Sequence, residues 1–148
     1  MTLKRIKRKI IYLIKKLFDP FYNVGKRFFF PPKIPINTNG KVLLHLGCGS
    51  INNPQFINID AANLPHVHYV QDIRNLAVLP SNFADLLYSS HALEHISHLE
   101  VPKTLKEWAR VIKKGGTIRL SVPDFDKMVG MYHASENNMR SIEAPLMG

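Results

Sequence analysis

The feature that most constrains the fold is a short apolar run that ends directly in a glycine turn. Residues 42–46 read Val-Leu-Leu-His-Leu and pass straight into Gly47-Cys48-Gly49. An apolar run of this length that stops at turn residues predicts a buried strand. The two glycines predict a turn in which the backbone approaches a ligand where a Cβ would collide.

Further short apolar runs separated by turns follow this first one. They occupy residues 56–60, 67–73, 84–90 and 117–122. Before the last run comes a stretch with helical spacing, whose apolar face holds Leu105, Trp108, Ala109 and Ile112. Strands that alternate with helices predict an α/β fold, here a Rossmann-like parallel sheet with flanking helices.

The end of the predicted helix and the last strand carry their own signals. The last turn of the predicted helix holds basic residues, which suit the negative end of the helix dipole: Arg110, Lys113 and Lys114. Gly115-Gly116 then predicts the C-cap. In the last strand, apolar residues alternate with polar ones at Ile118, Leu120 and Val122. This alternation predicts a strand with one well-covered face, near an edge of the sheet.

The composition fits one globular domain of 148 residues, with 45% hydrophobic and 21% charged residues. Cys48 is the only cysteine, so no intramolecular disulfide points to an oxidising compartment. No run approaches the ~18 apolar residues of a membrane-spanning helix. The apolar stretch at 10–14 ends at Lys15-Lys16 without a cleavage site for a secretory signal. We therefore expect a cytoplasmic protein.

The net charge of +9 is concentrated at the N-terminus. Residues 1–33 hold ten of the 20 basic residues and one of the 11 acidic residues, and the remainder is balanced. Apolar residues recur at spacings of three and four at Leu3, Ile6, Ile10, Leu13 and Leu17, which predicts an amphipathic helix over 3–18. We expect residues 1–35 to form this basic helix and an aromatic, proline-rich linker, and residues 36–148 to form the α/β domain.

Three roles stay open for the basic helix. It can lie on an anionic membrane surface, bind the phosphates of a nucleic acid, or pack on its own domain. The continuous apolar stripe favours a membrane surface, contacted through residues 1–19, over nucleic acid, because phosphate binding requires no such stripe.

Acidic residues end the second and third predicted strands. Ligands of open parallel sheets bind at the carboxyl ends of the strands, where Asp60 can accept both hydroxyls of a ribose and Asp72 the amino group of an adenine. Asn52-Asn53 stands where a dinucleotide fingerprint would have its third glycine. The pattern therefore predicts a nucleoside site without a pyrophosphate cradle.

These segments resemble class I S-adenosylmethionine-dependent methyltransferases, especially small bacterial enzymes of glycan and cell-surface polysaccharide biosynthesis. Residues 42–50 resemble the first motif of that family, and 56–60, 70–73, 84–96 and 105–124 resemble the later ones. The resemblance implies methyl transfer from S-adenosylmethionine to a glycan or glycolipid-type acceptor. Together with the basic helix, it leads us to expect this reaction at the cytoplasmic membrane surface. It implies cofactor binding by Gly47, Cys48, Gly49, Asp60, Asp72, Ile73, Ser90 and His91.

Two departures from the family pattern stand out. His45 replaces the usual acidic residue two positions before the first glycine. The family also continues its sheet with a β-hairpin after the fifth strand, so we expect an incomplete methyltransferase fold, with C-terminal strands missing and an open edge. A non-catalytic fragment or interaction module that keeps the fold is one alternative, and a nucleic-acid methyltransferase is another.

Three residues are candidates for the base that removes a proton from a hydroxyl acceptor: His95, His91 and Asp124, in that order. His91-Ala-Leu-Glu94-His95 also matches the H-x-x-E-H signature of zinc peptidases. A zinc site at His91 and His95 is a minor alternative, and we expect no metal. We expect Cys48 to be a small packed residue and not a nucleophile.

Overall fold

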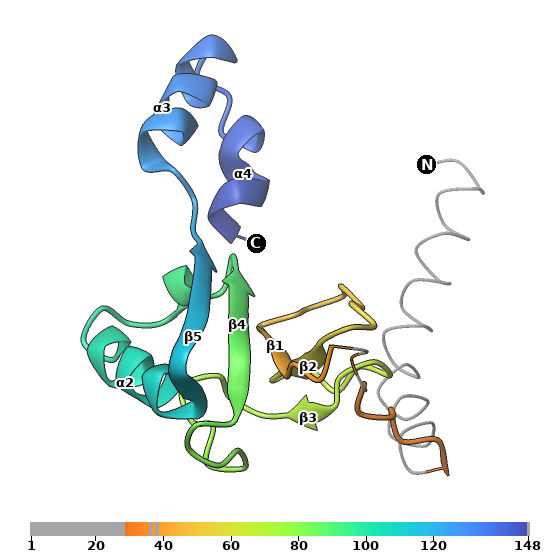
Figure 1. The fold of residues 1–148 in the computed structure, drawn as a ribbon. Coiled ribbons are helices and arrows are strands. Elements are labelled where there is room, and N and C mark those ends of the chain that lie inside the picture. Colours follow the sequence, from red (N-terminus) through yellow and green to blue (C-terminus); the bar gives the residue numbers. More distant parts are fainter. Residues whose placement is uncertain (1–28, 36, 38, 148) are drawn as a thin grey trace, which may run out of the picture.

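The computed structural model describes residues 29–147 apart from residues 36 and 38. The helix predicted over 3–18 lies outside the described residues. The described elements run in the order β1 (Leu43–Leu46), β2 (Ile57–Asp60), β3 (Tyr69–Val70), β4 (Ala84–Ser90), the 3₁₀ helix η1 (Leu93–His95), α2 (Val101–Val111), β5 (Ile112–Ser121), α3 (Phe125–Ala134) and α4 (Arg140–Met147) (Figure 1).

The strands form one parallel sheet in the order β3-β2-β1-β4-β5. In the centre, Leu44 of β1 lies opposite Ile57 of β2 on one side and Leu87 of β4 on the other. The α/β fold with a Rossmann-like parallel sheet and flanking helices is therefore confirmed. Because all pairs are parallel, the carboxyl ends of β1, β2 and β4 lie along one edge of the sheet.

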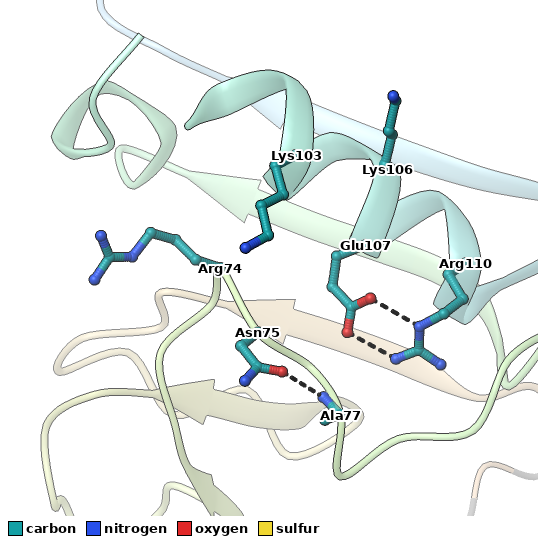
Figure 2. A pocket seen from close by; sticks show the side chains of 7 residues that line it. All are labelled: Arg74, Asn75, Ala77, Lys103, Lys106, Glu107 and Arg110. Carbon is teal, nitrogen blue, oxygen red and sulfur yellow. Dashed lines mark hydrogen bonds and ion pairs between the residues drawn. The ribbon is translucent and has the colours of Figure 1, made fainter. Parts of the chain in front are cut away.

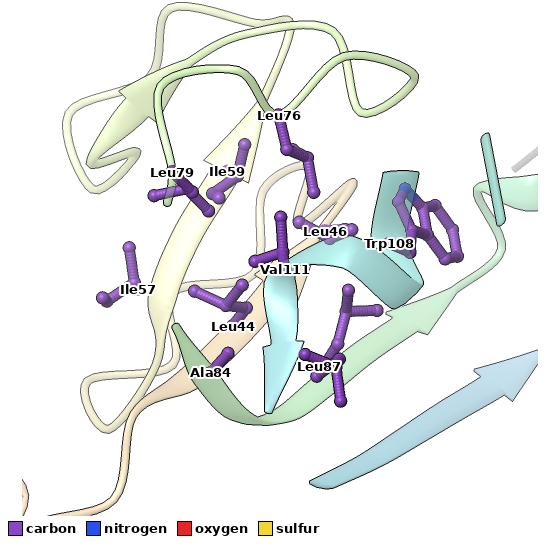
Figure 3. Packing of buried hydrophobic residues seen from close by; sticks show 11 residues of the cluster. Leu44, Leu46, Ile57, Ile59, Leu76, Leu79, Ala84, Leu87, Trp108 and Val111 are labelled. Carbon is purple, nitrogen blue, oxygen red and sulfur yellow. The ribbon is translucent and has the colours of Figure 1, made fainter. Parts of the chain in front are cut away.

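The core lies between this sheet and α2 (Figure 3). Leu44, Leu46 and Leu87 pack against Trp108 and Val111 of the helix, and all of these side chains are buried. The Trp108 indole Nε1 donates a hydrogen bond of 2.7 Å to the carbonyl oxygen of Ile73. The helix thus holds the loop that follows β3 as well as the sheet.

The third strand is shorter than predicted. Only Tyr69–Val70 of the predicted run 67–73 pairs with β2. Beyond it the chain turns, because the backbone N–H of Asn75 donates to the carbonyl oxygen of Asp72 at 3.0 Å. The prediction of a full strand was wrong because this turn stops the pairing.

The predicted end of the main helix was also wrong. The helix α2 ends at Val111 and β5 begins at Ile112, so Gly115-Gly116 is not a C-cap. Ala84 lies opposite Ile112 while Leu86 lies opposite Thr117, so residues 113–116 form an irregularity in the strand.

Asp85 gives the physical reason for this irregularity. Lys113 Nζ lies 2.7 Å from Asp85 Oδ2, so the lysine pairs with a carboxylate of β4 instead of the last helical carbonyls. The same oxygen accepts a 2.8 Å hydrogen bond from the backbone N–H of Val42. These bonds lower the pKa of Asp85 and tie β1, β4 and β5 together at their amino ends.

β5 lies at an edge of the described sheet, which confirms that part of the prediction. Its predicted covered face is not covered: Ile118 and Leu120 are 36% and 44% exposed. α3 and α4 follow β5 and extend past the carboxyl ends of the strands (Figure 1). Within the described ranges, no helix combines the length and apolar character needed to cross a bilayer.

Substituting Gly116 tests the packing of the irregular segment. A Cβ there would lie 2.8 Å from Ile112 Cγ2 and 3.0 Å from the carbonyl oxygens of Asp85 and Lys113. We expect Gly116→Ala to lower the free energy of unfolding by about 1–3 kcal/mol, measured as an earlier midpoint in urea at unchanged slope.

Gly130→Ala in α3 is the matched control, because no atom lies within 4 Å of its Cβ position. We expect it to leave stability unchanged or raise it by up to about 1 kcal/mol. Equal midpoints for the two alanine variants would contradict the packing described here.

Candidate functional site

The candidate site is a cavity of about 500 Å³ at the carboxyl ends of the strands. This volume lies within the range of small-molecule sites, ~300–1,000 Å³. Its lining residues are Gly47, Gly49, Asp60, Ala61, Asp72, Ile73, Arg74, His91, Ala92, His95 and Ile96. The fold therefore brings together most of the residues singled out in the sequence.

Gly47 forms the floor of the cavity. It has φ +64° and its backbone N–H donates to the carbonyl oxygen of Ile59 at 2.9 Å. A Cβ on Gly47 would lie 2.5 Å from the Cβ of Ala92, whereas Gly49 has open space at its Cβ position. A side chain at Gly47 would therefore collide with the segment after β4, so the loop after β1 lines the cavity as a cradle of backbone.

Asp60 faces this cradle from the end of β2. Its Oδ2 accepts a 2.7 Å hydrogen bond from the backbone N–H of Gly49, and its Oδ1 accepts one of 2.7 Å from Ala62. A carboxylate offers about four acceptor positions, so two stay available for the hydroxyls of a ligand. Asp60 therefore orders the loop and can bind a diol at the same time.

The Asp72 carboxylate is engaged by a residue that sequence reasoning missed. Arg74 Nη2 lies 2.6 Å from Asp72 Oδ2, and Arg74 Nη1 lies 2.8 Å from Glu100 Oε2. The guanidinium holds the pKa of Asp72 below its usual range. Arg74, which also lines the cavity, therefore competes with the amino group of an adenine for the Asp72 carboxylate.

The two histidines of the cavity come from the segment after β4. His91 has φ +51°, its backbone N–H donates to the carbonyl oxygen of Ser121 at 3.0 Å, and its Nδ1 lies 3.2 Å from Glu94 Oε1. His95 ends the short helix η1. Because residues 93–95 form a 3₁₀ turn and not a continuous α-helix from His91, the geometry of the zinc-peptidase signature does not form. Among the described residues, no three His, Cys, Asp or Glu side chains could hold a metal ion together.

Three predicted site residues are not among those that line the cavity. Ser90 pairs with Ser121 in the sheet. Asp124 is the N-cap of α3: its Oδ1 accepts from the backbone N–H of Lys127 at 3.1 Å. Cys48 is buried, with Sγ 4.0 Å from His66 Nε2. Asp124 is thus poorly placed as a base for this cavity.

His45, which stands at the position where the family has an acid, is buried in the sheet and does not line the cavity. Its ring centroid lies 5.1 Å from that of Tyr88. Burial lowers the pKa of His45, so the neutral ring prevails at neutral pH.

A second, mainly apolar cavity of about 530 Å³ adjoins the first. It lies between the segment after β4 and the start of α3, and Ile96 lines both cavities. Its lining residues are Leu93, Glu94, Ile96, His98, Val101, Val122, Pro123, Phe125 and Met128.

A third cavity, of about 720 Å³, lies between α2 and residues 74–77 (Figure 2). Most of its charged groups are already paired: Arg110 Nη2 lies 2.7 Å from Glu107 Oε1, and Arg74 binds Asp72 and Glu100. Unlike the cavity at the strand ends, it contains no glycine cradle. We therefore assign the candidate site to the strand ends.

The environment of Cys48 predicts slow alkylation. Burial, with the nearby charge of Asp60, raises the pKa of the Cys48 thiol to about 11. At pH 8 we expect iodoacetamide to label the folded protein at least about 100-fold more slowly than the urea-unfolded protein, because little thiolate forms. Equal rates, followed by mass spectrometry, would contradict the buried position.

Part of this chain is similar in sequence to a known protein family. Residues 48–120 match the family model described as a methyltransferase domain. No curated protein sequence gives a significant match. Two solved structures are similar in fold: a chain from the complex of the Haloferax volcanii Trm112 methyltransferase activator with a methyltransferase, and a SAM-dependent methyltransferase from Archaeoglobus fulgidus.

The two structural similarities are distant. The Haloferax chain has 16% identity and a TM-score of 0.49, over 82% of this chain and 62% of that one. The Archaeoglobus chain has 18% identity and a TM-score of 0.49, over 83% of this chain and 64% of that one. This chain thus spans less than two thirds of either. The family model matches residues 48–120, just under half of this chain.

Proposed function

We propose that the protein transfers a methyl group from S-adenosylmethionine, bound in the cavity at the strand ends. The observation that carries this proposal is the convergence of Gly47, Gly49 and Asp60 on that cavity. The residues fit the cofactor because open space surrounds the Cβ position of Gly49 and the Asp60 carboxylate keeps free acceptor positions.

The proposed roles of the residues follow from their positions. The loop at Gly47 and Gly49 would face the methionine part of the cofactor, Asp60 would accept hydrogen bonds from the ribose, and Ile73 would pack beside the adenine, with Arg74 and Asp72 at the rim. When bound, S-adenosylmethionine supplies a methyl group on a positively charged sulfur, which needs little further activation. The chain then has to position the acceptor and remove its proton.

We further propose a glycan or glycolipid-type acceptor at the cytoplasmic face of a membrane. The apolar cavity beside the cofactor cavity favours an acceptor with an apolar part, that is, the glycolipid type. The basic, apolar-striped sequence of residues 1–19 supports a membrane location, since such a helix would bring the enzyme to a lipid-linked substrate.

Asp60→Ala tests the cofactor site. Removing two hydrogen-bond acceptors for the ribose should weaken binding of S-adenosylhomocysteine by about 1.5–3 kcal/mol, measured by calorimetry. Asp126→Ala, at an exposed position in α3, should leave the affinity unchanged.

Two alanine variants at glycines of similar φ distinguish, in the same assay, the effect of a steric clash at the cavity from the effect of backbone strain. Gly47 and Gly40 have φ of +64° and +68°, but only Gly47 has an atom within 4 Å of its Cβ position. Gly47→Ala should lose binding and Gly40→Ala should keep it. Wild-type affinity in both Asp60→Ala and Gly47→Ala would refute the proposed site.

Deleting residues 1–19 tests the membrane proposal. The full chain should sediment with anionic phosphatidylserine vesicles and dissociate as salt is raised, because each basic residue near such a surface contributes ~1 kcal/mol. The deletion variant should no longer sediment, while its affinity for S-adenosylhomocysteine stays the same. Equal sedimentation of the two proteins, or tighter binding of the full chain to RNA than to vesicles, would argue against a membrane role.

A further inference from the structure

A histidine–carboxylate pair joins the two adjoining cavities. His91 lines the cavity at the strand ends, and Glu94 lines the apolar cavity beside it. The two side chains meet, with His91 Nδ1 3.2 Å from Glu94 Oε1. The pair therefore links the lining of one cavity to the lining of the other.

The backbone holds the histidine in an uncommon conformation. His91 has φ +51°, a left-handed region that residues other than glycine seldom occupy. Its backbone N–H is fixed by the carbonyl oxygen of Ser121 at the end of β5. Such conformations concentrate at functional sites, where the surrounding structure enforces them.

The nearby carboxylate also favours a proton on one of the two ring nitrogens. A negatively charged oxygen beside Nδ1 attracts an N–H and repels a lone pair, so in the neutral ring it favours the proton on Nδ1 and the lone pair on Nε2. His95, which lines the same cavity, makes no side-chain hydrogen bond or ion pair within residues 29–147 as described. Of these two histidines, only His91 thus has a carboxylate beside it that favours one tautomer.

We propose that Glu94 is a positioning residue that holds His91 as the proton acceptor for a hydroxyl group, on an acceptor whose apolar part occupies the second cavity. This inference rests on the proposed methyl transfer. The acceptor O–H bond breaks and its proton goes to His91 Nε2, while the oxygen forms a bond to the methyl carbon. The electron pair of the broken carbon–sulfur bond stays on the sulfur, which becomes a neutral thioether.

Ring nitrogen shifts of His91 test the pair directly. Two-dimensional ¹⁵N spectra are recorded on the full chain at about pH 8, where an ordinary imidazole is neutral, with His91→Asn used for assignment. In wild type we expect the pattern of an Nδ1–H ring. In Glu94→Ala we expect the more common Nε2–H pattern, and in Glu94→Gln, whose amide oxygen can still accept, the wild-type pattern.

Glu136→Gln, at an exposed position between α3 and α4, is the control and should leave the spectrum of His91 unchanged. Wild type and the three glutamate variants should bind S-adenosylhomocysteine within about twofold of each other, since Glu94 does not line the cofactor cavity. If wild type binds S-adenosylhomocysteine but His91 keeps the same pattern in Glu94→Ala, the role proposed for Glu94 is refuted while the proposed function stands. If wild type does not bind S-adenosylhomocysteine, the proposed function fails.

An alkyl glycoside probes the apolar cavity in the same samples. n-Octyl glucoside below its micelle concentration should shift the methyl signal of Met128 and the ring signals of His91. Glucose, which lacks the apolar chain, should shift neither. Equal shifts with both sugars, or no shift at Met128 with either, would overturn the assignment of this cavity to the acceptor.

Discussion

The site depends on how closely the end of β1 approaches the segment after β4. A Cβ on Gly47 would lie 2.5 Å from that of Ala92, so the two segments can meet only with glycine at this position. The positive φ of Gly47 and its bond to Ile59 direct the loop over β2, where the N–H of Gly49 reaches the Asp60 carboxylate. One close backbone contact thus sets both the floor of the cavity and the direction of its main polar group.

The helix α2 supports the opposite wall of the same cavity. Trp108 binds the carbonyl oxygen of Ile73, and Glu107 Oε1 accepts from the backbone N–H of Leu76 at 2.9 Å. Arg110 donates to the carbonyl oxygens of Leu76 and Leu79. A loop with little regular structure is therefore held by side chains of one helix, which keeps the rim at Asp72 and Arg74 in place.

Local patterns in the sequence were enough to predict the sheet and the loop at its centre. The range 84–90 was predicted as β4 has it, and Gly47, Gly49 and Asp60 were expected at strand ends, because strand length and turn glycines are local signals. The end of α2 was predicted wrongly because Lys113 binds Asp85, 28 positions away in the chain. No local sequence pattern predicts that Lys113 has a partner so far away in the chain.

Partners that are distant in the sequence also limited the prediction of the charged groups of the site. Arg74 was missed because its second partner, Glu100, lies 26 positions away, although its bonds to Asp72 are local. Asp124 looked like a candidate base until the structure showed that it caps α3. The pairing of Glu94 with His91 had a visible signal, their spacing of three, but the role of the pair depends on the two cavities that it joins.

A crystal structure of the chain with S-adenosylhomocysteine tests the central claim most directly. We expect the ribose hydroxyls to lie within about 2.5–3.0 Å of the Asp60 carboxylate oxygens and the homocysteine part to lie against Gly47 and Gly49. Binding in the cavity between α2 and residues 74–77, or a ribose without contact to Asp60, would contradict it.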